Sequence, residues 1–99
     1  MKLKIEFSGG LDLWFDNQKE IEIEVNPAAG KDNFTIEDLI EELRSKHLKE
    51  KEEMFVQNRT VRPGIIVLIN DTDWELEGTT EYACQPNDKI AFISTLHGG

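Results

Sequence analysis

The chain has 99 residues and a formal net charge of −9, with 20 acidic against 11 basic side chains. This length predicts one compact domain with a small core. The acidic balance disfavours direct binding to nucleic acid, because phosphate groups repel such a surface, and it suits a protein partner with a basic docking face. Cys84 has no second cysteine with which to pair, and no apolar run approaches the roughly 20 residues of a membrane span. We therefore expect a soluble protein of the cytoplasm, with the nucleus left open as a further location.

Two stretches near the N-terminus alternate apolar and polar residues, which is the pattern of a half-buried strand. Their apolar positions are Leu3, Ile5 and Phe7 in the first stretch and Ile21, Ile23 and Val25 in the second. The first strand is predicted to end at Ser8-Gly9-Gly10, which has the composition of a turn. Two neighbouring strands of this kind pair most easily as an antiparallel hairpin.

The clearest helix is predicted to begin after Thr35, which can cap its N-terminus with Asp38 as the acidic partner of a capping-box-like pair. Apolar residues then recur at positions i, i+3, i+4 and i+7, namely Ile36, Leu39, Ile40 and Leu43. Acidic side chains crowd the early turns and basic ones follow late, as the helix dipole favours. The pattern predicts an amphipathic helix that covers one face of a sheet.

The second half of the chain predicts three further strands. Residues 65–69 form an uninterrupted β-branched run, which favours a central strand buried on both faces beside a parallel neighbour. Residues 70–73 are dense in turn formers, and their spacing lacks the glycine and distal glutamate of a calcium loop. Residues 74–76 are predicted to form a short edge strand, and residues 89–93 the closing strand.

This order of elements predicts an α+β fold of the β-grasp kind, a mixed sheet of about five strands with one main helix packed across it. We place the domain at residues 1–93 and assign residues 94–99 to a flexible C-terminal tail. The sequence contains no repeat and indicates no second domain.

The chain lacks the parts of a catalytic or metal centre. Cys84 could act as a nucleophile with His47 or His97 as its base, but nothing in the sequence brings these residues together. A lone cysteine before a turn is more typical of a structural role. A zinc site needs about four ligands, and the chain has 1 cysteine and 2 histidines. We therefore expect no enzyme activity, no metal and no bound cofactor.

The chain ends on Gly98-Gly99, which leaves an unhindered terminal carboxylate. If an enzyme activated that carboxylate with ATP, attack by a persulfide would lead to a thiocarboxylate. Attack by a thiol and then by a lysine amine would instead give an isopeptide bond. An arm from Ser94 to Gly99 spans roughly 20 Å when extended, enough to enter a buried site. An idle, frayed end is the alternative, because disorder concentrates at termini.

The segment Arg62–Leu76, with the sequence RPGIIVLINDTDWEL, resembles the signature of the eukaryotic ubiquitin-related modifier family. Residues 93–99 are similar to that family's C-terminal end, and the pattern extends from the first strand to the last residue. The loop at residues 26–31, the Asn58-Arg59 step and Cys84 depart from it. These departures leave the implied function intact and put any role for Cys84 in doubt.

The resemblance implies a β-grasp fold and a double role. An activating adenylyltransferase with a rhodanese-like domain would use ATP to adenylate Gly99 and convert it to a thiocarboxylate. The sulfur would serve 2-thiolation of wobble uridine in cytosolic tRNAs, through a tRNA thiolation enzyme complex. Gly99 would also be attached to lysines of target proteins such as peroxiredoxins under oxidative stress. Enzyme recognition of the tail would fall to Thr95, Leu96, His97 and Gly98.

Two other functions remain open on sequence alone. One is a dedicated sulfur carrier for cofactor biosynthesis, of the molybdopterin or thiamine type, which would form no conjugates with lysine. The other is a ubiquitin-like interaction module whose tail is inert, and which would function normally without Gly98 and Gly99.

Overall fold

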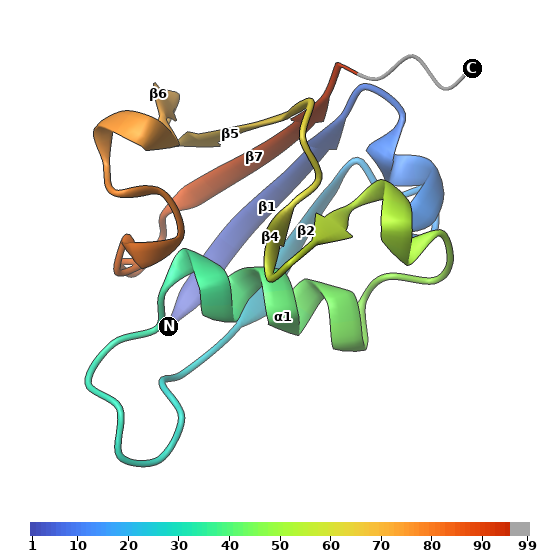
Figure 1. The fold of residues 1–99 in the computed structure, drawn as a ribbon. Coiled ribbons are helices and arrows are strands. Elements are labelled where there is room, and N and C mark those ends of the chain that lie inside the picture. The colour runs from blue at the N-terminus through green and yellow to red at the C-terminus, as the bar shows by residue number, and fades with distance from the viewer. Residues whose placement is uncertain (96–99) are drawn as a thin grey trace.

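Five strands form a mixed sheet in the computed structural model, which describes residues 1–95. Its strand order is β2-β1-β7-β5-β6 (Figure 1). Strand β1 (Lys2–Ser8) pairs antiparallel with β2 (Glu20–Glu24) and parallel with β7 (Lys89–Ser94). On its other side β7 pairs antiparallel with β5 (Ile65–Ile69), which in turn pairs with β6 (Thr72–Asp73). The last strand of the described chain is therefore the central strand of the sheet.

Helix α1 (Ile36–Lys46) lies across one face of this sheet, as its apolar stripe predicts (Figure 1). The predicted capping box is present: the Asp38 amide donates to Thr35 Oγ1 over 3.3 Å, and the Thr35 amide donates to Asp38 Oδ2 over 2.9 Å. Partial burial works against ionisation of Asp38, but hydrogen bonds from Lys31 and Thr35 outweigh it and lower the pKa of the carboxyl. The helix start is thus fixed by local side chains.

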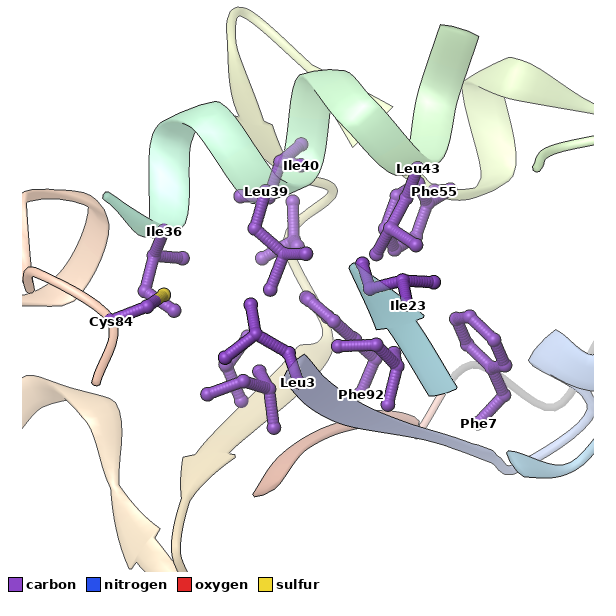
Figure 2. Packing of buried hydrophobic residues seen from close by; sticks show 14 of the residues in the cluster. Leu3, Phe7, Ile23, Ile36, Leu39, Ile40, Leu43, Phe55, Cys84 and Phe92 are labelled. Atoms are coloured by element: carbon purple, nitrogen blue, oxygen red, sulfur yellow. The ribbon is translucent and has the colours of Figure 1, made fainter. Parts of the chain in front are cut away.

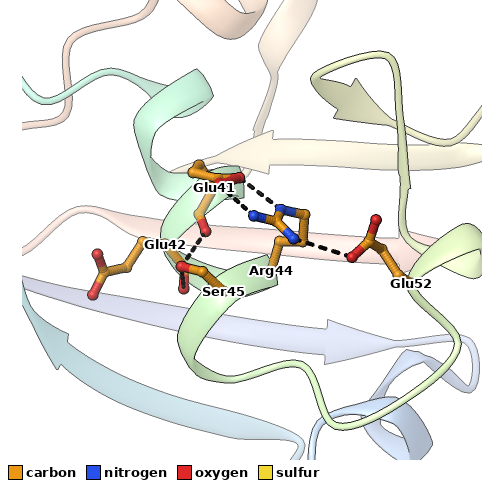
Figure 3. A network of polar contacts seen from close by, with 5 residues as sticks. All are labelled: Glu41, Glu42, Arg44, Ser45 and Glu52. Carbon is orange, nitrogen blue, oxygen red and sulfur yellow. Dashed lines mark hydrogen bonds and ion pairs between the residues drawn. The ribbon is translucent and has the colours of Figure 1, made fainter.

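The C-terminal half of the helix is joined to the segment that follows it by Arg44. This side chain is hydrogen-bonded to the carboxylate of Glu41 on the helix, and its Nη1 lies 3.1 Å from Glu52 Oε1 (Figure 3). Glu52 opens the short 3-10 helix η2 (Glu52–Met54), which leads into a small hairpin. Both glutamates are exposed and Arg44 is half-buried, so we assign the cluster an orienting role and little contribution to stability.

The remaining elements are short. They are the 3-10 helices η1 (Leu11–Trp14), η3 (Trp74–Leu76) and η4 (Thr79–Glu81), and a separate hairpin of β3 (Val56–Gln57) with β4 (Thr60–Val61).

The core lies between α1 and the covered face of the sheet, and side chains from both meet there (Figure 2). Four phenylalanine rings within this core contact one another in succession. The ring of Phe15 is stacked on Phe7 at a centroid distance of 4.0 Å and meets Phe55 edge-on at 5.1 Å. Phe55 in turn meets Phe92 of the central strand at 5.3 Å. These rings fix the short segments η1 and η2 against the sheet near the end of β7.

Two sequence predictions were wrong. Strand β5 was expected to be buried on both faces with a parallel neighbour, but both of its pairings are antiparallel and Ile66 is 42% exposed. A continuous apolar run does not distinguish a strand buried on both faces from one with an apolar exposed face. Residues 74–76 were expected to be an edge strand and instead form η3, because Asp73 Oδ1 accepts from the Glu75 amide and caps a helical turn. The edge strand is β6.

Candidate functional site

The candidate site is the point where the chain leaves the sheet, which we call the tail root and define as Ser94 and Thr95. Of the residues predicted to act in function, Thr95 is described, whereas Leu96, His97, Gly98 and Gly99 lie outside the described residues. The predicted boundary between domain and tail, at residues 93 and 94, stays a prediction. In the structure Ser94 is the last residue of β7 and Thr95 follows it.

On one side the tail root is held by the turn that precedes β5. The register pairs Ser94 with Ile65, so Thr95 comes opposite Gly64. The Thr95 amide donates to the Gly64 carbonyl oxygen over 3.0 Å, and the Thr95 hydroxyl donates to the same oxygen over 2.6 Å. Gly64 has a φ of 99°, a backbone conformation that favours glycine. We call this pair of bonds the Thr95 latch.

On the other side the tail root lies against the turn that follows β1. The backbone of Gly9 approaches Ser94 so closely that a Cβ built on Gly9 would lie 2.0 Å from the Ser94 carbonyl oxygen. Its φ of 71° also favours glycine. A shallow depression next to this contact is lined in part by Leu13, Trp14 and Met54. Two turns that are distant in sequence therefore flank the end of β7 (Figure 1).

The sheet face opposite α1 is apolar near the tail root and charged away from it. Ile66 of β5 is 42% exposed and pairs in register with the partly exposed Ile93 of β7. Leu68 and Ala91 form the next pair along the same face. Strands β1 and β2 instead carry ion pairs there, such as Lys4 with Glu20. We call Ile66, Leu68, Ala91 and Ile93 the apolar strip, which the sequence prediction of a doubly buried β5 missed.

The other end of β7 begins at a buried carboxylate. Asp88 is 6% exposed, and its Oδ2 accepts from the Tyr82 hydroxyl over 2.7 Å and from the Gln85 amide over 2.8 Å. Its Oδ1 accepts from the side-chain amide of Asn70 over 2.8 Å, and Asn70 Oδ1 accepts from the Lys89 amide. This network ties the start of β7 to the β5–β6 turn. Nothing in the spacing of these polar residues distinguishes them from ordinary turn formers.

Among the described residues, Cys84 and its candidate base His47 are not brought together. Cys84 packs beside Ile36 at the start of α1, where its amide donates to the Phe34 carbonyl, whereas His47 is the C-cap at the other end of that helix (Figure 2). Burial, and secondarily the charges of Asp88 and Asp38, raise the pKa of the Cys84 thiol to about 12. A thiol so protonated is a poor nucleophile. His97, the other candidate base, lies outside the described residues.

Within residues 1–95, no group of three or more histidine, cysteine, aspartate or glutamate side chains is placed to hold a metal ion. No helix among those residues is both long and apolar enough to cross a membrane.

Within residues 1–95, one α-helix packs on a mixed five-stranded sheet that has a parallel pair at its centre. This arrangement defines a ubiquitin-like β-grasp protein. The comparisons with known proteins name its family. The model of the family described as Urm1 (Ubiquitin related modifier) matches residues 2–99, a range that includes the terminal glycines. The chain belongs to the ubiquitin-related modifier family.

Curated relatives and solved structures agree with this assignment. The chain is similar to the ubiquitin-related modifier 1 homolog of Dictyostelium discoideum, at 54% identity over 100% of each chain. It is also similar to the homolog of Chlamydomonas reinhardtii, at 52% identity over 100% of this chain and 99% of that one. The solution structure of Urm1 from Trypanosoma brucei matches with a TM-score of 0.82 and 34% identity, over 99% and 95% of the two chains.

A more distant likeness supports the fold alone. It is to a chain in the crystal structure of the Amycolatopsis orientalis BexX/CysO complex, at 20% identity and a TM-score of 0.71, over 98% of this chain and 99% of that one. The family match, the curated relatives and the Urm1 structure confirm three predictions made from the sequence. These are the family, the β-grasp fold, and the function of a ubiquitin-like sulfur carrier and modifier.

Proposed function

We propose that the working group of this sulfur carrier and modifier is the carboxylate of Gly99, and that the folded body presents it to an activating enzyme. The observation that carries the proposal is the family match, which runs through the terminal Gly98-Gly99. It is supported by the separation of Cys84 from His47 at opposite ends of α1, and by the central place in the sheet of the strand that precedes the tail.

Activation begins when the Gly99 carboxylate attacks ATP, forming an acyl adenylate and releasing pyrophosphate. A persulfide sulfur on the enzyme then attacks the acyl carbon and expels AMP, which gives an acyl disulfide. A second enzyme thiol cleaves that disulfide, leaving the thiocarboxylate on Gly99 and a disulfide on the enzyme. A carboxylate that follows two glycines suits this chemistry because no side chain obstructs the attacking atoms. ATP belongs to the activating enzyme, and this chain binds no cofactor of its own.

The geometry of the tail root limits where the enzyme can dock. From the Thr95 latch, the four residues 96–99 span at most about 13 Å when extended. The enzyme must therefore cover the surface around the latch. The apolar strip lies there, and Ile66 and Ile93 would supply the apolar contact that a docking face requires. The net charge of −9 would favour an enzyme with a basic rim.

The activated chain serves two acceptors. Its thiocarboxylate donates sulfur for 2-thiolation of wobble uridine in cytosolic tRNAs, and the acidic body leaves contact with the tRNA to the thiolation enzyme. Its activated acyl group is also transferred to lysines of target proteins such as peroxiredoxins during oxidative stress. Both roles place the protein in the cytoplasm, which cell fractionation would test.

Intact-mass analysis is the direct test. The full chain is incubated with ATP, a persulfide donor and the activating adenylyltransferase with its rhodanese-like domain. We expect a mass increase equal to the exchange of one oxygen for one sulfur, localised to Gly99 by fragmentation. A chain lacking Gly99 is the control and should gain no sulfur. A wild-type chain that never exchanges oxygen for sulfur would refute the proposal.

Cellular conjugates separate this function from the alternatives. Isopeptide bonds between Gly99 and target lysines would exclude a dedicated sulfur carrier of the molybdopterin or thiamine type. Normal tRNA thiolation in cells whose copy lacks Gly98 and Gly99 would instead favour an inert interaction module.

A further inference from the structure

The Thr95 latch is notable because burial does not enforce it. The side chain of Thr95 is exposed, and so is Gly64. A hydroxyl in that position could bond to water at little cost, yet it lies 2.6 Å from the Gly64 carbonyl oxygen, which already accepts from the Thr95 amide. The amide bond continues the β5–β7 ladder by one position, whereas the hydroxyl bond is an addition specific to threonine or serine.

We propose that Thr95 is a positioning residue for the activation of Gly99, whose hydroxyl holds the tail root on Gly64 so that the reactive arm begins from a fixed point. This inference rests on the proposed function and gives Thr95 a role in the body of the protein, in addition to the contact with the activating enzyme predicted from sequence. Thr95 does not touch the reacting carboxylate, so it is not a catalytic residue.

The two turns around the tail root explain how one hydrogen bond can have this effect. The close approach of Gly9 blocks movement of Ser94 toward β1, since the Ser94 carbonyl oxygen already occupies the space a side chain would need. The latch restrains the next residue on the opposite side, toward β5. With both contacts in place, the position and direction of the backbone are set at Ser94 and Thr95.

Because the arm from the Thr95 latch to Gly99 is short, the latch affects where the Gly99 carboxylate can be placed. Four residues beyond the latch reach at most about 13 Å, and release of Thr95 adds a fifth residue and about 3 Å of reach. A docked body would then hold the carboxylate over a larger volume, so a smaller fraction of arms would place it against the bound ATP. Misplacement of a reacting group lowers the rate of the chemical step, whereas the docking surface and its affinity stay as they were.

The size of the effect follows from the bond that is removed. A single neutral hydrogen bond contributes enough to change a local equilibrium by a factor of about 2 to 10. The backbone bond from the Thr95 amide remains when the hydroxyl is lost, so the latch weakens without disappearing. We therefore expect a reduction in the rate of adenylation in that range.

The test compares Thr95→Val with Thr95→Ser in the full chain. Valine keeps the β-branched shape and removes the donor, whereas serine keeps the hydroxyl. ATP–pyrophosphate exchange by the activating adenylyltransferase is measured at increasing concentrations of each chain. We expect Thr95→Val to lower kcat about 2- to 10-fold with KM within about twofold of wild type, and Thr95→Ser to restore most of kcat. Equal thermal unfolding of the three chains would exclude a folding defect.

Three results would overturn the inference. They are an unchanged kcat in Thr95→Val, a change confined to KM, which would assign the hydroxyl to enzyme binding, and a failure of serine to rescue. Hydrogen exchange of the Thr95 amide, measured by NMR on the free chain, tests the latch without the enzyme, and faster exchange in the valine variant is expected. If wild type supports no exchange of pyrophosphate, the proposed function fails and the inference fails with it. If wild type is active and the variants equal it, only the inference fails.

Discussion

The two ends of strand β7 are fixed in opposite ways. Its start is attached to the body by a buried carboxylate, Asp88, that accepts hydrogen bonds from three groups. Its finish is held by the exposed Thr95 latch and by a close backbone contact with Gly9. The same strand thus joins a buried, hydrogen-bonded start to an exposed end, and in the proposed function that exposed end leads to the reactive Gly99.

This difference follows from what each end must do. A buried network resists opening because each polar group would lose its partner in an apolar environment. Exposed hydrogen bonds exchange with water at small cost, so they can orient a segment and still let a partner rearrange it. Stability at the start of β7 keeps the central strand in register, and the weaker restraint at its end would let a docked partner rearrange Ser94 and Thr95.

The largest expected effect is at the stable end and concerns Cys84, which is 5% exposed. Because burial raises its thiol pKa from 9.0 to about 12, the reactive thiolate at neutral pH is about a thousandfold scarcer than in the unfolded chain. We expect alkylation by iodoacetamide to be slower by at least about a thousandfold in native protein than in urea. The rate should rise with pH, since the thiolate fraction grows toward a pKa of about 12. If native protein were alkylated as fast as unfolded protein, Cys84 would not be protected by burial and the structure around the start of β7 would be open to solvent.

Asp88→Ala should cause the next largest change. It leaves the Tyr82 hydroxyl, the Asn70 side-chain amide and the Gln85 amide without their common acceptor. We expect a loss of about 3 kcal/mol in the free energy of unfolding, measured by urea denaturation. Cys84 alkylation should accelerate in parallel. Glu81→Ala, at an exposed position nearby, is the matched control and should change stability by less than about 0.5 kcal/mol. Equal stability of the two variants would contradict the structural role of Asp88.

The finish of β7 can be probed with a pair of glycines. Gly9→Ala and Gly10→Ala both place alanine at positive φ, 71° and 95°, which costs each variant about 1 kcal/mol. Only at Gly9 would the new Cβ meet the backbone of Ser94, whereas nothing lies within 4 Å of it at Gly10. The free energy of unfolding of Gly9→Ala should therefore be lower than that of Gly10→Ala by about 1 kcal/mol. It should also slow adenylation of Gly99, because the tail root is displaced. Identical behaviour of the two variants would argue against the close contact.

The contrast between the ends also explains what the sequence could predict. The helix stripe and the Thr35–Asp38 capping box are local patterns, and both were confirmed. The exposure of Ile66 could not be predicted, because an apolar run carries no sign of which face is covered. Gly9 was predicted to lie in a turn, but its contact with Ser94 joins residues far apart in the chain. The Thr95 latch depends on the same kind of long-range register. The role of Gly99 was predicted from the family resemblance, because spacing and composition alone did not exclude a tail without function.

The smallest expected effect is that of Thr95→Val on stability, and it tests whether the two ends of β7 are independent. Asp88 and Thr95 lie seven positions apart on an extended segment, which separates them by roughly 23 Å. Sites that far apart without shared partners contribute independently to stability. Thr95→Val should change the free energy of unfolding by less than about 1 kcal/mol, because the group it removes is exposed.

A double-mutant cycle with Asp88→Asn, which keeps the size of the side chain, therefore measures the independence of the two ends. We expect the double variant to equal the sum of the single variants within about 0.5 kcal/mol in urea denaturation. We also expect Asp88→Asn to leave the adenylation rate of folded protein unchanged, because the latch does not depend on the network. A coupling well above that value would mean that β7 transmits changes along its length. The Asp88 network at the start of β7 would then also influence the Thr95 latch at its end, and the two ends would not be independent.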